Sequence, residues 1–442
     1  MFRAAFYEKE ITPPLGCFIP GYFNLRRGSD VKDRLYARAT VIQNDTDTIA
    51  IISMDSCTME MRMRDAICAR IEKYVGIKPD NVMVACTHSH TGIPKIGYSG
   101  NGTPEGDDAV DCQAGYFDVF TKLIADCVIL AYYRLFDAEI SYSIGEVNGI
   151  SFCRNYIMKN STPRTNPGRL NPDIERPYTD TDNELPILSV KDKDGNLRGA
   201  IICFACHADC VDGTAYSGDY IAELSKQLKK LYGEEFVTVF LLGTCGDINH
   251  FNVKTEKDAP DHYRKMGRKI AGEVQKMVAF AEPVVGDTVK SRFALIPIHR
   301  RPVSNDKIAE AKHIVETVKE DKNAKIAADN TSKEQYELAM AKSLLRFLET
   351  TPEIVQMPMQ VMEIGDVKLF AFPNEVFSKF GKDVKKKAGA AKRFVASICN
   401  ESRGYIPTED LIYDTIYEAR IGANCLEAKA GEIMANKLIE MA

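Results

Sequence analysis

The sequence contains no uninterrupted apolar stretch of about 18 residues, the length that a membrane-spanning helix needs. It also has no long basic run, and its net charge is -5, which argues against a nucleic-acid-binding surface and against anchoring to anionic lipid. The opening residues carry no apolar core of a secretory signal. Tryptophan is absent as well, but this excludes no fold. What remains is an ordinary globular composition, with 45% hydrophobic and 27% charged residues.

The 13 cysteines are odd in number, scattered and mostly set in apolar runs. This distribution fits reduced thiols better than a disulfide framework, so we expect a cytoplasmic protein. No linker, fixed-period repeat or low-complexity tract divides the 442 residues, and we therefore expect a single domain over 1–442. Within it, a Lys/Glu-rich stretch at about 305–350 has apolar residues at helical spacing, which predicts a helical hairpin split near Ala328–Asn330.

Three strand–helix–strand units organise the predicted fold. Such βαβ units imply parallel strands joined by right-handed crossovers. We therefore expect an α/β fold of mixed, largely parallel sheets flanked by helices, with the active site at the carboxyl ends of the strands. The three units cover 48–53, 61–75 and 81–86, then 198–208, 219–232 and 236–242, and finally 368–372, 375–387 and 393–399.

The segment 87–92, THSHTG, is the most informative stretch, because it holds two of only seven histidines. His88 and His90 follow an apolar run, and residues i and i+2 of an extended segment point to the same side. The pair suits a metal site or a proton-transfer site, and it also fits two histidines that are merely hydrogen-bonded at a strand end.

Residues able to bind a metal or move a proton follow strands in all three units. They are His88, His90, His207, Glu375 and Tyr405. Imidazoles with one carboxylate and an open position form the donor set of catalytic zinc, and a phenol is an unusual but possible fourth ligand. Asp55 stands at the same predicted edge of the sheet.

The sequence around His207 also matches two other metal-binding patterns. Cys203, Cys206 and His207 match the C-x-x-C-H pattern of haem attachment, but strand alternation would put the two cysteines on opposite faces. A zinc site of Cys203, Cys206 and Cys210 is a weaker rival, because no second cysteine pair has metal-binding spacing.

Motifs over almost the whole chain resemble the catalytic domain of the neutral/alkaline (non-lysosomal) ceramidases. Each motif is weak alone, but their order is specific for this superfamily. The motifs are ITPPLG at 11–16, LYAR at 35–38, THSHTG at 87–92, FACH at 204–207, SGD at 217–219, GD at 246–247, FPNE at 372–375, GYIP at 404–407 and YE at 417–418.

The resemblance implies a zinc-dependent hydrolase that cleaves an amide (N-acyl) bond of a small-molecule or lipid-like substrate. The implied Zn²⁺ ligands are His88, His207, Glu375 and Tyr405.

The resemblance also implies roles around the substrate. His90 would face it, Arg154 would bind its polar part, and Tyr417 would lie near the scissile carbonyl. A proton must also reach the leaving amine, and His90 or Asp55 is expected to supply it.

The family's C-terminal immunoglobulin-like domain has no counterpart in this sequence, which favours a smaller soluble substrate over a membrane lipid. Two alternatives therefore stay open. One is a metal-dependent hydrolase of another small ester, amide or phosphoester, and the other is a non-catalytic protein that binds a metal or a small molecule. The oligomeric state is also open, including a homo-oligomer.

Overall fold

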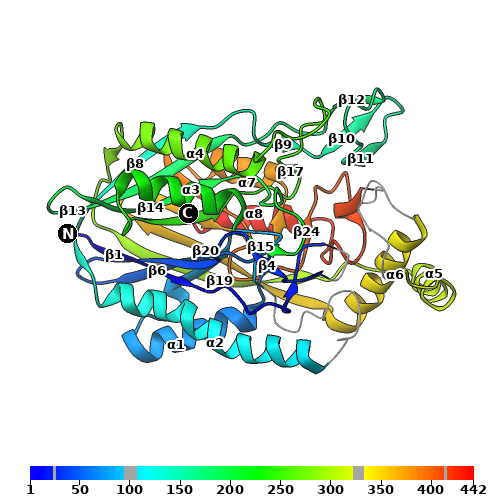
Figure 1. Cartoon of the computed structure of the whole chain (residues 1–442), viewed down its shortest axis with the longest axis horizontal. Coiled ribbons are helices and arrows are strands. Elements are labelled where there is room, and N and C mark those ends of the chain that lie inside the picture. The colour runs from blue at the N-terminus through cyan, green and yellow to red at the C-terminus, as the bar shows by residue number, and fades with distance from the viewer. Residues whose placement is uncertain (23–25, 94–106, 322–332, 413–415) are drawn as a thin grey trace.

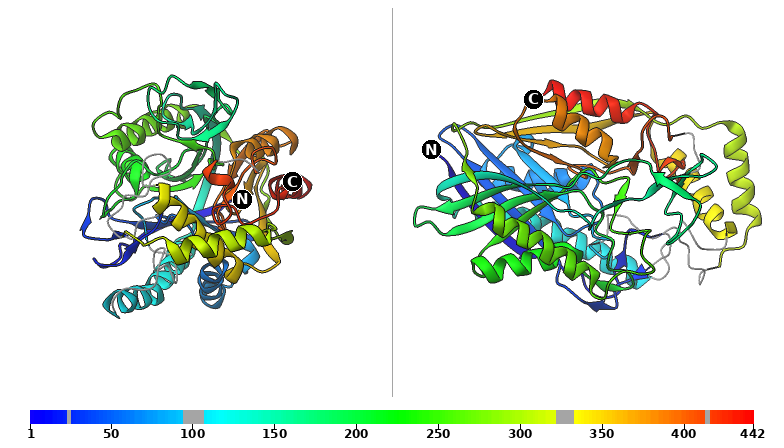
Figure 2. Two further views of the ribbon diagram at one scale, coloured as in Figure 1. Left: turned by 90° about the vertical axis from the view of Figure 1, so that its right-hand side faces the viewer. Right: turned by 90° about the horizontal axis from the view of Figure 1, so that it is seen from above.

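The computed structural model describes residues 1–22, 26–93, 107–321, 333–412 and 416–442. Its elements form four layers, in the order helices, a nine-stranded sheet, a four-stranded sheet and further helices. Figure 2 (right) shows green helices on one side, orange and red helices on the other, and the sheets between them. The fold is therefore a mixed α/β sandwich.

The nine-stranded sheet runs through the middle of the molecule (Figure 1). In spatial order its strands are β16 (Val237–Leu242), β14 (Leu197–Phe204), β13 (Glu184–Asp192), β8 (Phe136–Glu146), β1 (Arg3–Glu10), β5 (Tyr36–Gln43), β6 (Thr48–Met54) and β7 (Val82–Cys86), and β18 (Glu282–Pro283) pairs with β8. The four-stranded sheet packs on one of its faces and comprises β19 (Val289–His299), β20 (Ile354–Ile364), β21 (Val367–Ala371) and β23 (Lys392–Ala396).

Helices cover the two outer faces of this sheet pair. The nine-stranded sheet carries α1 (Met61–Val75), α2 (Asp107–Tyr132), α3 (Asp219–Tyr232) and α4 (His262–Val278). The four-stranded sheet carries α7 (Ser378–Lys387) and α8 (Ala430–Glu440). Two further helices, α5 (Asn305–Thr317) and α6 (Lys333–Thr350), pack against each other within the stretch predicted as a hairpin. The predicted split at Ala328–Asn330 lies outside the described residues.

Short strand pairs line one end of the sandwich. They are β2 (Phe18–Ile19) with β3 (Arg26–Arg27), β4 (Asp30–Val31) with β15 (Ala215–Tyr216), β9 (Phe152–Cys153) with β17 (Ile248–Asn249), and β22 (Glu375–Val376) with β24 (Tyr405–Ile406). The remaining elements are the three-stranded sheet of β10 (Asn155–Met158), β11 (Pro163–Thr165) and β12 (Ile174–Pro177), and the 3₁₀ turns η1 (Pro79–Asn81) and η2 (Tyr417–Ala419).

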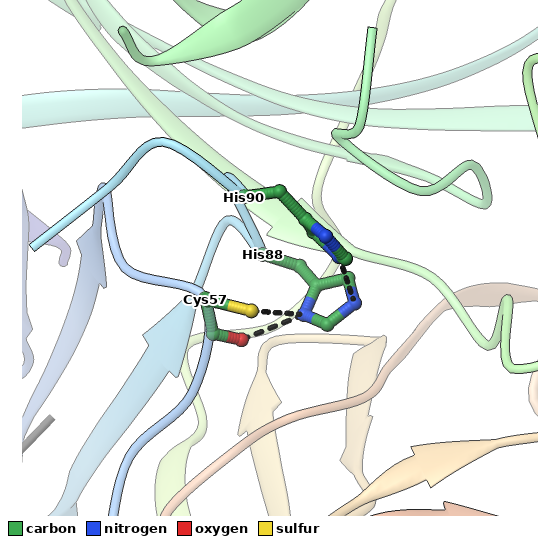
Figure 3. Close-up of side chains that lie close together, drawn as sticks. All are labelled: Cys57, His88 and His90. Carbon is green, nitrogen blue, oxygen red and sulfur yellow. Dashed lines mark hydrogen bonds between the residues drawn. The ribbon is translucent and has the colours of Figure 1, made fainter. Parts of the chain in front are cut away.

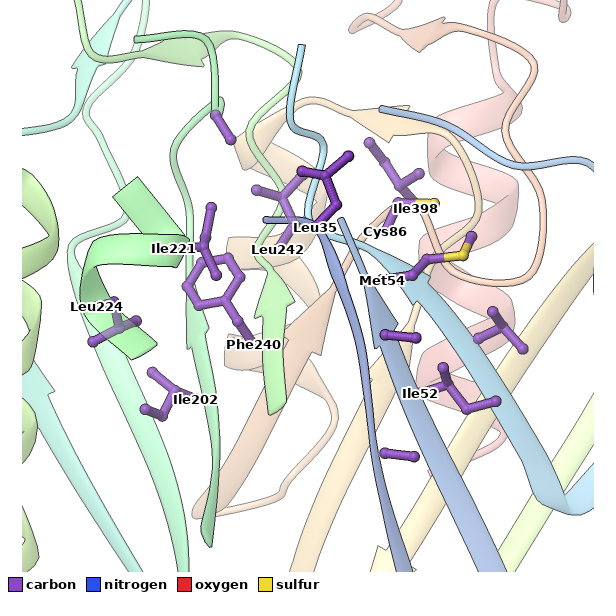
Figure 4. Packing of buried hydrophobic residues seen from close by; sticks show 14 of the residues in the cluster. Leu35, Ile52, Met54, Cys86, Ile202, Ile221, Leu224, Phe240, Leu242 and Ile398 are labelled. Carbon is purple, nitrogen blue, oxygen red and sulfur yellow. The ribbon is translucent and has the colours of Figure 1, made fainter. Parts of the chain in front are cut away.

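The central strands are apolar on both faces because each face meets a different layer. In β6, Ile52 joins the core under the helices, whereas Ile51 joins the core between the two sheets. Figure 4 shows the first of these cores, where Phe240 lies beside Ile221 of α3 and Ile202 lies near Leu224 of the same helix. Each fully buried side chain of this size contributes about 1.5–3 kcal/mol to folding, so the two cores hold the layers together.

The prediction of largely parallel sheets is wrong. In the nine-stranded sheet the described pairs are antiparallel except β14–β16 and β6–β7, and in the four-stranded sheet the parallel pair is β21–β23. A sheet buried on both faces has continuous apolar strands whatever their direction, so the sequence pattern cannot separate the two cases. Each of the three parallel pairs is joined by one helix, namely α1, α3 or α7.

The two sheets meet at the carboxyl ends of β7, β16 and β23. Ala85 forms a bridge with Cys399, and Gly243 forms one with Ala396. The Asn400 side chain accepts a hydrogen bond from Val84 N at 3.1 Å. These links bring segments from both sheets to one end of the sandwich, where the candidate site lies.

The ten described cysteines from Cys57 to Cys399 are free thiols. None of the helices in the described ranges combines the length and the apolar character that crossing a bilayer requires.

Candidate metal centre

His88 reaches the site through a strained turn rather than an extended segment. Strand β7 ends at Cys86, and His88 has a φ of 65°, in the left-handed region. Backbone bonds to β6 and the residues after it fix this turn, because Thr87 N donates to Met54 O and His88 N donates to Ser56 O, each at 2.9 Å. Residues held in this region by their surroundings are common at functional sites.

The rings of His88 and His90 still converge, as the H-x-H spacing predicted. Their Nε2 atoms are 3.3 Å apart and their ring centroids 4.8 Å apart, which Figure 3 shows beside Cys57. The two rings therefore converge as predicted. The cause is the turn at His88, and not the extended backbone that the sequence suggested.

Two histidines have one ring nitrogen committed to the backbone. His88 Nδ1 lies 2.6 Å from Cys57 O (Figure 3), and His207 Nδ1 lies 2.9 Å from both Cys245 O and Ile248 O. A carbonyl oxygen only accepts, so each Nδ1 carries the hydrogen in the neutral ring and each Nε2 keeps a lone pair. Histidines that bind metals typically donate their other ring N–H in this way.

Glu375 is the first residue of β22, where strand pairing and a close backbone contact fix it. β22 and β24 pair in parallel, with Glu375 opposite Tyr405, and Glu375 N donates to Gly404 O at 3.0 Å. A Cβ on Gly246 would lie 2.4 Å from Glu375 O, so only glycine allows this approach. Asp247, the next residue, accepts hydrogen bonds from Ser378 N and Oγ at the start of α7.

These elements bring His88, His207 and Glu375 to one point. Glu375 Oε2 lies 3.2 Å from His88 Nε2 and 3.4 Å from His207 Nε2, and the side chains of the two histidines are 1% exposed. Glu375 Oε2 is buried and has no hydrogen-bond partner among the described residues. Two nitrogen lone pairs and a carboxylate oxygen that face one buried point are a donor set suited to a divalent metal ion. All three residues are among the ligands expected from the sequence.

Tyr405 borders the same point. Its ring is stacked on that of His207, with centroids 6.4 Å apart and planes at 7°. Tyr405 also stands opposite Glu375 in the β22–β24 pair, so it lies beside two of the candidate ligands.

Cys57, His88 and His90 form a second set of close donor atoms. Cys57 Sγ lies 3.7 Å from His88 Nδ1, the nitrogen already bonded to Cys57 O, so an ion beside that thiol would compete with this bond. The set with His207 and Glu375 leaves that bond intact, so it is the better candidate.

His90 is held by residues that the sequence analysis did not single out. Asp209 Oδ1 lies 3.5 Å from His90 Nδ1, and the Tyr22 hydroxyl donates to the same oxygen. Arg26 donates to His90 O at 2.6 Å, and its guanidinium lies over the Tyr22 ring. Gly21 has a φ of +104°, and a Cβ there would lie 2.8 Å from the His90 ring.

Arg154 lies beside the candidate ligands but is already paired. Its Nε is 2.6 Å from Glu418 Oε1, and Glu418 is fully buried. It also donates to Gly246 O at 2.7 Å and approaches His207 Nε2 at 3.4 Å, and its guanidinium lies 4.9 Å from the Tyr405 ring centroid. This network fixes the arginine against the strand ends.

Tyr417 lies next to Tyr405 in the candidate site, whereas Asp55 is bonded to Arg38 and Tyr36. The Tyr417 ring is T-shaped to that of Tyr405, with centroids 5.5 Å apart, so it lies within the candidate site. The carboxylate of Asp55 is fully buried and is occupied by other partners. It accepts from Arg38 at 3.0 and 3.1 Å and from Tyr36 N at 2.8 Å.

Burial and neighbouring charges set the protonation of the cluster. Burial, together with Arg154 and His88, lowers the pKa of His207 to about 4, and burial lowers the pKa of His90 to about 3. For Glu375, burial acts to raise the pKa, but His88 and His207 outweigh it and hold the pKa well below its ordinary value. For His88, burial acts to lower the pKa, but Cys57 and Glu375 raise it well above the ordinary value. A metal ion would compete with that proton.

Sequence reasoning missed Tyr22, Asp209 and Glu418. Asp209 lies two residues after His207 and Glu418 directly follows Tyr417, so adjacency to a proposed site residue was the available signal. Tyr22 had no such signal, because its contact with Asp209 spans 187 residues.

Comparison with known proteins identifies the family of this chain. A family model described as neutral/alkaline non-lysosomal ceramidase, N-terminal, matches residues 8–257, more than half of the chain. The neutral ceramidase of Drosophila pseudoobscura pseudoobscura is 25% identical over 275 residues, which cover 56% of this chain and 36% of that protein. The neutral ceramidase of Pseudomonas aeruginosa is 23% identical over 300 residues, 64% of this chain and 42% of that protein. The chain thus spans less than half the length of these curated relatives.

Solved structures show the same fold. The crystal structure of neutral ceramidase from Pseudomonas aeruginosa matches 100% of this chain and 74% of that chain, with a TM-score of 0.73 and 20% identity. A ceramidase complexed with C2 gives a TM-score of 0.73 and 18% identity. Glu375, Tyr405 and Tyr417 lie beyond the region that the family model covers, but the structural match includes them. The chain belongs to the neutral/alkaline non-lysosomal ceramidase family.

Proposed function

We propose that this protein is a zinc-dependent hydrolase that cleaves an amide (N-acyl) bond. The observation that carries the proposal is the position of Glu375 Oε2, 3.2 Å from His88 Nε2 and 3.4 Å from His207 Nε2. Both histidines donate Nδ1–H to backbone carbonyls, so their lone pairs are directed at the same point. His88, His207, Glu375 and Tyr405 would hold the ion, as expected from the sequence.

When bound, Zn²⁺ activates a water molecule for attack on a carbonyl carbon. The chain's own residues would position the substrate and move protons. Asp209 lies 3.5 Å from His90 Nδ1, which favours a hydrogen on that nitrogen and leaves Nε2 able to accept a proton and pass it to the leaving amine. Tyr417 would donate its hydroxyl hydrogen to the carbonyl oxygen as negative charge develops there.

The position of Asp55 argues against the proton-transfer role expected from the sequence. Its carboxylate accepts hydrogen bonds from Arg38, Tyr36 and Thr87 within a fully buried network. We assign it instead to holding the turn that carries His88.

Arg154 bears on the class of substrate. Its charge is compensated by the buried Glu418 at 2.6 Å, so it offers no free positive charge to an anionic group. This favours a neutral amide over a phosphoester, and Arg154 then orients His207 and Tyr405 or a carbonyl of the substrate. Because the curated relatives are neutral ceramidases, ceramide is the first substrate to test, and a smaller soluble amide is the alternative.

The test is hydrolysis of a series of N-acyl amides, from N-acetyl to long-chain ceramide, by the zinc-loaded protein, with phosphate esters in parallel. Release of the free amine from at least one amide, and no hydrolysis of phosphate esters, is expected. Full metal occupancy without hydrolysis of any member would instead favour a binding protein. The cytoplasmic location predicted from the cysteines remains part of the proposal.

A further inference from the structure

A second group of potential metal ligands lies outside the candidate metal centre. Cys210 follows β14, His250 follows β17, and His262 is the first residue of α4. One donor atom from each lies within 4.8 Å of the others. The two imidazole centroids are 5.2 Å apart, with planes at 45°. Three separate segments therefore bring a thiol and two imidazoles together.

The hydrogen bonds of His250 leave one nitrogen for a ligand. His250 Nε2 lies 3.0 Å from Asp209 O, and because a carbonyl only accepts, Nε2 carries the hydrogen in the neutral ring. The lone pair is then on Nδ1, which is buried and has no hydrogen-bond partner among the described residues. This is the arrangement of His88 and His207 with the two ring nitrogens exchanged.

His262 also has an unsatisfied buried nitrogen. Its Nε2 is buried and lacks a hydrogen-bond partner within the described ranges. A buried polar atom without a partner costs about 1–3 kcal/mol, and two such atoms beside one thiol are unusual unless a ligand satisfies them. A metal ion between the three residues would satisfy both nitrogens at once.

The donor atoms indicate which ions fit. Cys210 Sγ lies 3.4 Å from Met266 Sδ, and Met266 is four residues after His262 on the same face of α4. Thiol and thioether sulfur select soft ions such as Zn²⁺ and Cu⁺ over Mg²⁺ or Ca²⁺. The carboxylates of Asp209 and Asp219 both interact electrostatically with His250, which favours a positive charge at this place.

We propose that Cys210, His250 and His262 bind a second, thiophilic metal ion, Zn²⁺ or Cu⁺, at a site separate from His88, His207 and Glu375. The ion would fasten the segments after β14 and β17 to the start of α4. It would act next to the candidate active site, because Asp209 precedes Cys210 in the chain and also approaches His90. The proposal does not depend on the reaction that the protein catalyses.

The first experiment is elemental analysis of metal-free protein reloaded with Zn²⁺ alone or with Cu⁺ alone under reducing, oxygen-free conditions. The wild type is expected to bind more than one equivalent of at least one of these ions. His262→Ala and Cys210→Ser should each lose one equivalent and keep the other, and His207→Ala should lose only the other. His313→Ala, which alters an exposed histidine of α5, is the matched control and should bind as much metal as the wild type.

A spectroscopic readout keeps the proposal falsifiable if a variant folds poorly. Cobalt-substituted wild type and His207→Ala should show a thiolate-to-cobalt charge-transfer band, because Cys210 is proposed as a ligand only in the second site. Absence of that band in the wild type would overturn the proposal. Equal metal content in folded Cys210→Ser, folded His262→Ala and the wild type would also overturn it. A His207→Ala variant that loses one equivalent of metal but keeps the charge-transfer band would support the second site independently of the proposed catalytic site.

Discussion

The molecule has two histidine clusters, which are close neighbours in the chain. The first is His88, His207 and Glu375, and the second is Cys210, His250 and His262. In the first cluster the side chains of His88 and His207 are 1% exposed and share the carboxylate of Glu375 on β22. In the second, the residues are only partly buried, and the extra donor is sulfur. Two imidazoles and a carboxylate with an open position are a donor set of catalytic zinc, whereas the sulfur donor of the second cluster selects a soft ion. The two proposals therefore give histidine two different roles, which its partners determine.

The largest expected difference between the clusters is in activity. His207→Ala should lose metal from the first cluster and lower amide hydrolysis by more than about 100-fold, the upper range for removing an outer partner of a ligand. His262→Ala should retain most of the activity, because His262 belongs to neither the proposed catalytic ligands nor the residues proposed to face the substrate. Steady-state rates measured with metal content test this contrast, and His299→Ala, an exposed position, is the control. Equal activity losses in His207→Ala and His262→Ala would contradict the division of roles.

Tyr405 and Tyr417 are expected to have different roles in the first cluster, although their ring centroids are only 5.5 Å apart. A change to Phe removes only the hydroxyl group from each of them. Tyr417→Phe is expected to lower kcat by about 100-fold with zinc content unchanged, as for loss of a donor to the developing oxyanion. Tyr405→Phe should instead weaken zinc binding, measured by competition with a chelator. If both variants keep wild-type kcat and zinc affinity, the assignment of these two phenols is wrong.

The buried ion pair of Arg154 and Glu418 beside the first cluster is expected to stabilise the folded protein. Glu418→Gln leaves the buried Arg154 without a charged partner, which should cost about 3–5 kcal/mol in the free energy of unfolding. The exposed pair Lys437–Glu440 is the control, and Lys437→Ala should change that free energy by less than about 1 kcal/mol. Urea unfolding gives both values. A cost for Glu418→Gln as small as that of the control would show that Arg154 is not held by this pair.

The smallest expected effect is on the stability contributed by the second cluster. A bound ion at 100 times its Kd stabilises a protein by about 2.7 kcal/mol, so His262→Ala should lower Tm by a few degrees when metal is present. The difference should vanish in metal-free buffer. Calorimetry of both proteins with and without Zn²⁺ measures it, and a Tm difference that is the same in both buffers would indicate lost packing instead of a lost ion.

Local sequence patterns predicted which residues meet in the candidate site, but not the strand directions or the residues that hold them in place. His88, His207 and Glu375 each follow a strand, and strands that end at a common edge bring such residues together. Strand direction was not predictable, because Ile51 and Ile52 enter different cores and make β6 apolar on both faces. The partner of Asp55 was not predicted either. Arg38 stands opposite Ser53 in an antiparallel pair, which places its guanidinium against that carboxylate. The contact of Tyr22 with Asp209 is set by the tertiary fold alone.

The most direct test of the central claim is the position of the ion in crystals of zinc-loaded protein, located by the anomalous scattering of zinc. The account predicts a peak about 2.0–2.2 Å from His88 Nε2, His207 Nε2 and a carboxylate oxygen of Glu375. A fully loaded crystal with no peak between these three side chains, or with the ion held by Cys57 and His90 instead, would contradict it.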